Sequence, residues 1–498
     1  GMAWTAAAFE GGLTNVRASR FRSPSVQVRV GDYEFDNTNG GGGRGRGASY
    51  SLSGFPLDDD PAVIRQYLWL ETDSAYKGAV QAIAQKRASR RSVNVTDQLP
   101  DFDKAKPFTL TEDRPLISFD NKTWNDRIRR VSAEFSKFPN LRDSIVTYSV
   151  TDGVHRYINS EGTKIRQMQT EVRLQLAANI QAKDGMILRD SAYYYTQDVS
   201  RMPSEAEMTG SVRKIADELS KLAAAPIGDD YSGPILFEGT ASSQLMAELL
   251  GRNLHMNRPA SAGGRGGRGG FPGGRGGGGA TELQGRRGVR IMPEMFNVVD
   301  DPTLPGFGHT EVDNEGVPSL PVTLVEKGVL KDFLRTRLPV QGFSESNGRA
   351  LLGNSPAPTN LIITTTEKSS ISEMKQKLID LCKQRSLPFG IIVRKLEFPA
   401  IGGPAGGVAP PIYTYRVYPD GHEEMIRGVR LRGVDVRSLK DILLAGDDST
   451  TLDYVEGGSA DVSVIAPSVL IDDLELEKVN DTLPKLPAAP PPVEGIAR

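Results

Sequence analysis

Long segments in which polar and apolar residues alternate, between residues 144 and 197, constrain the fold of this chain most strongly. The segments are SIVTYSV, VHRYINS, TKIRQMQTEVRLQLAANIQA and MILRDSAYYYTQ, and they are separated by the pairs Asp152-Gly153, Glu161-Gly162 and Asp184-Gly185. Alternation with a period of two is typical of strands with one buried face, and an acidic residue before glycine favours a tight turn. The region therefore predicts an antiparallel meander.

Two stretches flanking this meander have apolar residues at helical spacing. The first runs from Asp59 to Arg91 and has a proline near its start. The second runs from Ser204 to Ala225, and its Ser204 and Glu207 match a capping box. Helices on one face of an antiparallel sheet make an α+β domain. We therefore predict an N-terminal α+β domain over residues 1–225.

The sequence changes character after residue 225. Strand-like apolar runs dominate from there on, such as LPVTLVEKGVLKDFLRT, NLIITTT, FGIIVRKLEF, IYTYRVYP and DVSVIAPSVLI. Two helical patterns, Ser243–Leu250 and Ser370–Gln384, interrupt them. The pattern predicts a second, β-rich domain over residues 226–485 and a Pro-rich tail over residues 486–498. The expected fold class is α+β.

The charge balance argues against nucleic acid and membranes as partners. The 498 residues include 60 Lys and Arg against 62 Asp and Glu, a formal net charge of -2. No apolar run approaches the roughly 18–20 residues that cross a bilayer. Two tracts, Gly40–Gly47 and Gly263–Gly279, resemble RGG boxes, but together they contain a single aromatic residue, Phe271. We interpret both as solvated loop insertions and keep nucleic-acid binding as an alternative.

Cysteine and histidine are scarce. The single cysteine, Cys382, excludes an internal disulfide and multi-cysteine metal sites, and it falls on the apolar side of a predicted helix. Of the four histidines, His422 follows a predicted turn at Asp420-Gly421. The one local grouping that could serve an alternative metal site is His309, Glu311 and Asp313.

Five segments resemble the TldD/PmbA family, also called modulators of DNA gyrase. They are LWLETDSAYKGAV, DYSGPILFEGTASSQLMAELLG, HTEVDNEGVPSLPVTLVEKGVLKDFLRTR, GNSPAPTNLII and VIAPSVLIDDLEL. The resemblance covers most of the chain and is strongest in its second half. It implies a peptide-binding and dimerising N-terminal domain, followed by a β-rich C-terminal domain of the family type.

The resemblance also implies where a zinc site would lie. Catalytic members are zinc metallopeptidases with an HExxxH motif on the helix after the first strand of the C-terminal domain, and a cysteine near its end. The two histidine positions fall on Phe237 and Ser242, and the glutamate falls on Glu238. The expected cysteine region, Asp453–Ser459, contains no cysteine.

Active members of the family bind zinc through these three ligands. In this chain the resemblance places no ligand at any of the three positions. Phenylalanine cannot ligate a metal, and a serine hydroxyl is a poor zinc ligand. We predict no metal and no cofactor for this chain. Glu238 is expected to be the remnant of a general base, with a remaining role in electrostatics or hydrogen bonding at a helix start.

The family implies a dimeric particle whose active members cleave unfolded peptides, with one subunit type carrying zinc and a second lacking it. The leading hypothesis is a catalytically inactive chain that forms a heterodimer with a zinc-bearing TldD-type subunit, or a peptide-binding homodimer. The exposed edge of the N-terminal sheet would pair with the peptide. The alternative is an active metallopeptidase with a non-standard metal site. The family implies a cytoplasmic protein, while Gly1-Met2, typical of a cloning remnant, leaves a trimmed exported precursor open.

Overall fold

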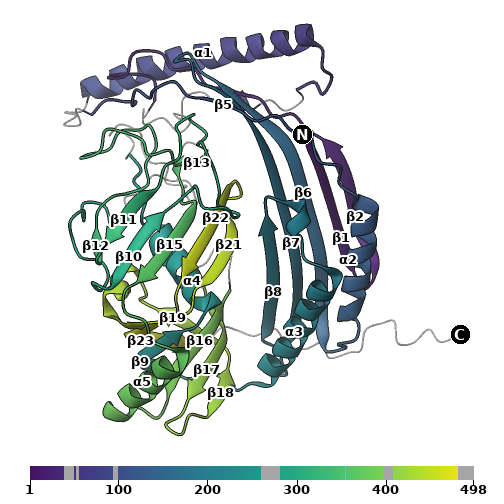
Figure 1. The fold of residues 1–498 in the computed structure, drawn as a ribbon, viewed down its shortest axis with the longest axis vertical. Helices are drawn as coiled ribbons and strands as arrows, with labels where there is room; N and C mark the ends of the chain where they lie inside the picture. The colour runs from purple at the N-terminus through teal and green to yellow at the C-terminus, as the bar shows by residue number, and fades with distance from the viewer. Residues whose placement is uncertain are drawn as a thin grey trace, which may run out of the picture.

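The computed structural model describes residues 1–38, 50–51, 55–92, 99–258, 281–353, 355–397 and 408–479. Both Gly/Arg tracts and the Pro-rich tail lie outside these ranges, so the interpretations of those segments stay predictions. The chain forms a large curved sheet followed by a β-rich region that lies against the sheet's inner face (Figure 1). The α+β class predicted from the sequence is confirmed.

The N-terminal sheet has the strand order β2-β1-β6-β7-β5, and β8 joins the same edge of β7 as β5. All neighbours are antiparallel except β5 and β7. The strands are β1 (Met2–Phe9), β2 (Gly12–Arg20), β5 (Thr109–Thr111), β6 (Leu141–Ile158), β7 (Lys164–Gln181) and β8 (Ile187–Thr196). The predicted meander and its last two turns are confirmed.

The predicted turn at Asp152-Gly153 is wrong, because β6 runs through it without interruption. Gly153 lies opposite Gln169 in the β6–β7 ladder. Asp152 is fully buried, and its carboxylate accepts hydrogen bonds from Arg114, from the Thr170 hydroxyl and from a backbone amide. Asp152-Gly153 favours a turn locally, but hydrogen bonds to residues distant in sequence keep the pair in a strand.

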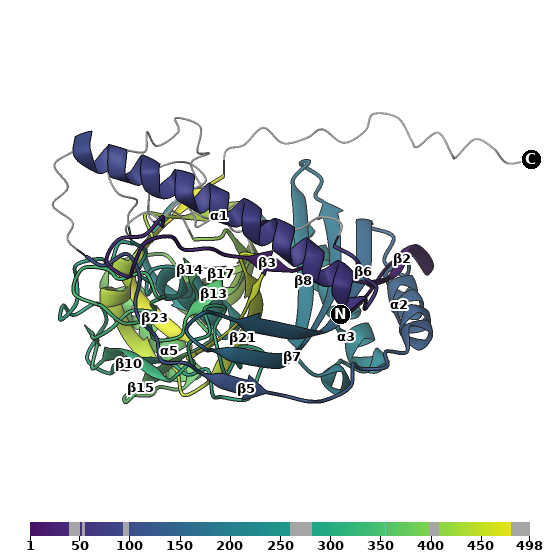
Figure 2. The same cartoon turned by 90° about the horizontal axis from the view of Figure 1, so that it is seen from above.

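Two helices, α2 (Asn121–Phe135) and α3 (Glu205–Ala224), cover the outer face of this sheet (Figure 1). The capping box of Ser204 and Glu207 is present at the start of α3. The sequence analysis did not predict α2. A long helix, α1 (Pro61–Ser92), crosses one end of the molecule above both halves (Figure 2). None of the described helices has the length and apolar character that crossing a bilayer requires.

The C-terminal half contains two larger sheets with the orders β12-β11-β10-β15-β22-β21 and β18-β17-β16-β9-β23-β19, and β20 pairs with β23. The first sheet consists of β10 (Phe296–Asp300), β11 (Val322–Glu326), β12 (Val329–Leu330), β15 (Asn360–Thr365), β21 (Thr450–Glu456) and β22 (Ala460–Ala466). The second consists of β9 (Tyr231–Phe237), β16 (Gly390–Leu396), β17 (Pro411–Val417), β18 (Glu423–Ile426), β19 (Val429–Arg432), β20 (Ile442–Ala445) and β23 (Val469–Lys478).

Helix α4 (Thr240–Met246) contacts β16 of one sheet and β21 and β22 of the other. It continues as one π-helical turn, Ala247–Gly251, and every residue from Ala241 to Gly251 is buried. Helix α5 (Ile371–Gln384) packs on β9 and β16. The predicted helix Ser243–Leu250 is thus confirmed with an earlier start, as the central element of the C-terminal core.

Short elements complete the fold. They are the strand pairs β3 (Ser25–Val26) with β4 (Tyr50–Ser51) and β13 (Ala350–Leu352) with β14 (Ser355–Pro356), and the 3₁₀ helices Val199–Arg201 and Val436–Asp441. The link between α3 and β9 lies near the predicted boundary at residue 225, which stays a prediction.

Candidate functional site

The segment that resembles the metal motif forms a strand, a tight turn and a helix. Phe237 is the last residue of β9, and its side chain is 0% exposed within the hydrophobic core. Gly239 has a φ of 49° and precedes α4, and at a positive φ glycine avoids the strain of a β-carbon. Of the two positions that match the histidines of the family motif, Ser242 therefore lies on α4, whereas Phe237 ends the preceding strand.

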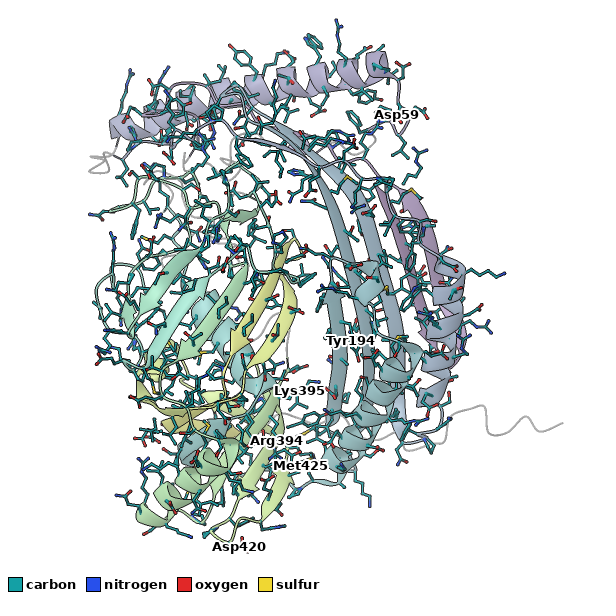
Figure 3. The ribbon with its side chains drawn as sticks, viewed as in Figure 1. Asp59, Tyr194, Arg394, Lys395, Asp420 and Met425 are labelled. Atoms are coloured by element: carbon teal, nitrogen blue, oxygen red, sulfur yellow. The ribbon has the colours of Figure 1, made fainter. Side chains whose placement is uncertain are left out.

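Glu238 participates in a chain of ion pairs. Its Oε2 accepts a hydrogen bond from Nε of Arg394 at 2.7 Å, and Nη1 of Arg394 donates to Glu423 at 2.9 Å. Lys375 binds the other oxygen of Glu423 at 2.6 Å. The guanidinium of Arg394, labelled in Figure 3, lies 4.5 Å from the ring centre of Tyr415. The Glu238 carboxylate is therefore fixed against a cation, and its side chain is 14% exposed.

These contacts stabilise the charged state of Arg394. Burial alone would lower the pKa of its guanidinium, but the hydrogen bonds and charges of Glu238 and Glu423 raise that pKa above its usual value. Burial opposes ionisation of Glu423, but Lys375 and Arg394 hold the pKa of its carboxyl below the usual range. The expectation of an electrostatic role for Glu238 agrees with this geometry.

Ser242 is fully buried and has a partner within the core. Its hydroxyl donates to the carbonyl of Pro467 at 2.6 Å, and the neighbouring Ser243 hydroxyl donates to the carbonyl of Thr450 at 2.7 Å. Both hydroxyls thus tie α4 to the strands around it. Zinc does not fit these positions, because Phe237 has no donor atom, Ser242 bonds to backbone and Glu238 is paired with Arg394.

The alternative metal grouping of His309, Glu311 and Asp313 is not assembled. Nδ1 of His309 lies 2.9 Å from the carbonyl oxygen of Pro302. The buried Asp313 carboxylate accepts hydrogen bonds from three backbone amides, those of Glu315, Val317 and Ala350. Among the residues that the structure describes, no group of three or more His, Cys, Asp or Glu could hold a metal ion. His309, Glu311 and Asp313 therefore do not form a metal-binding group in the described structure, and nothing in it supports the alternative of a metal site there.

The remaining single-residue predictions hold. Asp420-Gly421 forms the turn between β17 and β18, and the backbone amide of His422 donates to the Asp420 carboxylate. The His422 ring stacks on Tyr418 at 5.9 Å. Cys382 is buried in α5, as the sequence predicts for a small apolar residue.

A cavity of about 320 Å³ lies between the N-terminal sheet and the C-terminal half, beside the first turn of α4. The residues that line it come from β7, β8, the 3₁₀ helix Val199–Arg201, α4, β16 and β21. They include Tyr193, Tyr195, Thr240, Gln244, Lys395 and Asp453. The Tyr193 and Tyr195 rings stack with their centres 5.8 Å apart. The sequence analysis did not identify this site, although the YYY triplet in a predicted strand was a signal.

Lys395 lies where this cavity meets a second one of about 210 Å³. Its ammonium group bonds to the carboxylate of Asp190 and, at 2.7 Å, to the carbonyl of Ser191, both on β8. Figure 3 shows Lys395 between the C-terminal half and the N-terminal sheet. The two cavities share Ser191, Tyr193 and Lys395, so together they follow β8 across the interface between the two halves.

The outer edge of β8 borders these cavities. Among the described strands β8 pairs with β7 alone, so its other edge has backbone N–H and C=O groups without a strand partner. Such an edge can pair with an extended chain through backbone hydrogen bonds. The site therefore combines an open strand edge, two stacked aromatic rings and the start of the helix that carries Ser242.

Comparison with known proteins agrees with this architecture. Residues 232–478 match the family model of the PmbA/TldA metallopeptidase C-terminal domain. A protein named metalloprotease from Archaeoglobus fulgidus is 48% identical over 59 residues, which are 12% of this chain and 14% of that protein. Another metalloprotease, from Methanothermobacter thermautotrophicus, is 38% identical over 81 residues, 16% of this chain and 18% of that protein. The chain thus matches less than a fifth of the length of either relative.

Solved structures share the whole fold at low sequence identity. A candidate modulator of a DNA gyrase from Thermotoga maritima superposes with a TM-score of 0.62 at 16% identity, covering 95% of this chain and 94% of that one. TldE from Thermococcus kodakarensis gives a TM-score of 0.59 at 14% identity, covering 96% and 94%. The fold is therefore that of the metallopeptidase-like modulators of DNA gyrase. The chain belongs to the TldD/PmbA family.

Proposed function

We propose that this chain is a TldD/PmbA homologue without peptidase activity, which binds extended peptides between its two halves. The observation that carries the proposal is the use of all three motif positions for structure. Phe237 is a core side chain, Glu238 pairs with Arg394, and the Ser242 hydroxyl bonds to Pro467. A zinc-bound water needs three protein ligands and an open fourth position, which these residues do not supply.

Peptide binding is supported by the free edge of β8. An extended peptide that added to this edge would satisfy the unpaired backbone groups of the strand and would enter the cavity lined by Tyr193 and Tyr195. Backbone pairing is largely independent of side-chain identity, which suits binding to unfolded chains of varied sequence. The two stacked tyrosines supply large apolar surfaces for side chains of the peptide.

The family resemblance further supports a role as a partner subunit. In this proposal the chain assembles with a second, zinc-bearing TldD-type subunit, or with another copy of itself, and presents peptide without cutting it. The comparisons support the fold. The proposed role as a partner subunit rests on the motif positions of this chain, which have no residues that bind zinc.

Peptide binding without cleavage can be tested directly. An unstructured peptide of about ten residues is titrated into the protein by calorimetry, and the mixture is then analysed by mass spectrometry. The matched control is the same sequence with N-methylated amides at alternate residues, which cannot donate the backbone hydrogen bonds of a strand. The proposal expects binding of the first peptide, weaker binding of the second, and intact peptide. Equal binding of both peptides, or cleavage products in the absence of any partner, would refute it.

A further inference from the structure

One wall of the interdomain cavity contains a carboxylate without a cation. Asp453 on β21 lines the cavity, and its Oδ1 accepts a hydrogen bond from the Ser463 hydroxyl at 2.6 Å. The Ser463 oxygen accepts the backbone amide of Gly308 at 3.2 Å, so its own proton is available to Asp453. Within the described part of the chain, Asp453 forms no ion pair.

A second carboxyl group lies next to this wall and adds negative charge once the pH exceeds its pKa. Asp461 on the adjacent strand β22 has one buried oxygen without a hydrogen-bond partner in the described structure, and the other accepts from Gln197 at 3.4 Å. Burial raises the pKa of Asp461 to about 7, and Glu171 on β7 adds to that shift. Arg173 opposes the shift, but its guanidinium is hydrogen-bonded to Glu171. Burial also raises the pKa of Asp453.

The two cations that line the cavity do not neutralise Asp453. Lys395 bonds to Asp190 and to the Ser191 carbonyl. Arg201 lies 3.9 Å from the Asp198 carboxylate, and its side chain is largely exposed. Asp453 is partly buried. Partial burial of a carboxylate without a positive partner costs free energy, and a ligand that brings a cation would offset that cost.

The aromatic wall of the cavity favours a cation as well. Tyr193 and Tyr195 line the same space as Asp453, and the Tyr195 ring also packs on Phe307 with centres 5.2 Å apart. The faces of aromatic rings carry partial negative charge and attract ammonium groups. Carboxylate and ring faces together resemble the surroundings that bind primary amines in proteins.

We infer that Asp453 forms a subsite for a primary ammonium group of the bound peptide, carried by a lysine side chain or by the N-terminal amino group, with Tyr193 and Tyr195 completing the subsite. This inference rests on the proposed peptide-binding function and states which peptides the cavity prefers. It needs no metal and no chemical step: binding replaces the hydration of the ammonium group by a carboxylate and ring faces.

Binding at this subsite depends on pH. The ammonium group needs Asp453 ionised, so affinity falls as the pH drops through the pKa of that carboxyl, which burial raises. The titratable groups that line the same cavity as Asp453 are Tyr193, Tyr194 and Tyr195 from β8, Arg201 from the 3₁₀ helix and Lys395 from β16. Asp461 from β22 lies next to it, and Glu171 and Arg173 from β7 act in turn on Asp461 and Tyr195. Ionisation of Asp461 near neutral pH would further favour the bound cation.

The test compares three peptides of equal length on the full chain by calorimetry at pH 8. One contains a central lysine and an acetylated N-terminus, the second replaces the lysine by norleucine, and the third is the norleucine peptide with a free N-terminus. We expect the lysine peptide, the free N-terminus peptide or both to bind about tenfold more tightly than the acetylated norleucine peptide. Which of the two gains affinity identifies the source of the ammonium group.

Asp453→Asn should remove this difference, so that all three peptides bind the variant with the same affinity. Asp217→Asn, which changes an exposed carboxylate on α3, is the matched control and should behave as wild type. Equal binding of all three peptides to the wild-type protein would overturn the subsite but not peptide binding. Failure of every peptide to bind would instead overturn the proposed function. The wild-type comparison decides the question even if the Asp453 variant does not fold.

Discussion

Nε of Arg394 donates a hydrogen bond at 2.7 Å to the carboxylate of Glu238, the residue that takes the place of the family's general base. In a zinc peptidase that glutamate must face the metal-bound water and exchange protons with it. Here the carboxylate is held by an arginine that also binds Glu423, so its negative charge is used for structure. At the position of the family's general base, this chain therefore has a carboxylate that forms an ion pair.

Glu238→Gln should lower the free energy of unfolding by about 1 kcal/mol, because Arg394 loses one of two charged partners in a partly exposed site. Urea denaturation measures the change. Arg394→Gln should cost a similar amount, and the double variant should cost clearly less than the sum of the two, because both substitutions remove the same ion pair. Additive effects would show that the pair contributes nothing to stability.

Gly239→Ala should destabilise the protein by about 1–3 kcal/mol, because φ of 49° is strained for a residue with a β-carbon. The added carbon would meet the Thr450 hydroxyl at 3.5 Å, an ordinary contact, so the cost comes from the backbone. Gly210→Ala in α3 is the control, since its β-carbon meets nothing within 4 Å. That change should stabilise the protein by up to about 1 kcal/mol. If both variants changed the free energy of unfolding in the same direction, the strained backbone at Gly239 would not be the cause.

Lys395→Met should be more destabilising than Lys395→Met combined with Asp190→Asn. The single change leaves the buried Asp190 carboxylate with the Tyr413 hydroxyl as its remaining side-chain partner, whereas the double change removes the charge that needs compensation. We expect a cost of about 2–4 kcal/mol for the single variant. Thermal or chemical unfolding of both variants measures it. Equal stability of the single and double variants would show that the Lys395–Asp190 ion pair does not stabilise the contact between the N-terminal sheet and the C-terminal half.

Stability should fall as the pH rises from about 4.5 to about 7, and Glu315 should account for part of this fall. Burial and the neighbouring Asp313 raise the pKa of Glu315 to about 7, so the folded chain keeps a proton that the unfolded chain releases near its usual, lower pKa. The folded state therefore binds more protons across this window, and the free energy of unfolding decreases with pH. Glu315→Gln should flatten the profile while its side-chain oxygen still accepts the Arg337 amide. An unchanged slope would contradict this role.

Local patterns in the sequence were enough to predict most of the strands and the two α-helices that begin with a Ser–Glu capping box, α3 and α5. Helix α2 was missed although its buried residues Trp124, Ile128, Val131 and Phe135 have helical spacing, because polar residues dominate the rest of that segment. The failed turn at Asp152 depended on Arg114 and Thr170, partners that no local pattern reveals. Long-range hydrogen bonds thus determine that Asp152 lies in a strand, although its local sequence favours a turn.

The candidate site was predictable only in part. The sequence alone shows that Phe237 and Ser242 stand where the family resemblance places histidines. The cavity could not be predicted from the sequence, because its walls come from residues as far apart as Tyr193 and Asp453. The ion pair of Glu238 also needed the fold, since Arg394 is 156 residues away along the chain. Because the residues of the site are distant in sequence, the site can be recognised only in the folded structure.

The metal content of the purified protein shows whether the motif positions hold zinc. The full chain is measured by elemental mass spectrometry as purified, and again after incubation with zinc and removal of the free metal by desalting. We expect far less than one zinc per chain in both samples, because Phe237, Glu238 and Ser242 are all committed to the core and its ion pairs. One zinc retained per chain after desalting would show that the protein holds the metal and would overturn this expectation.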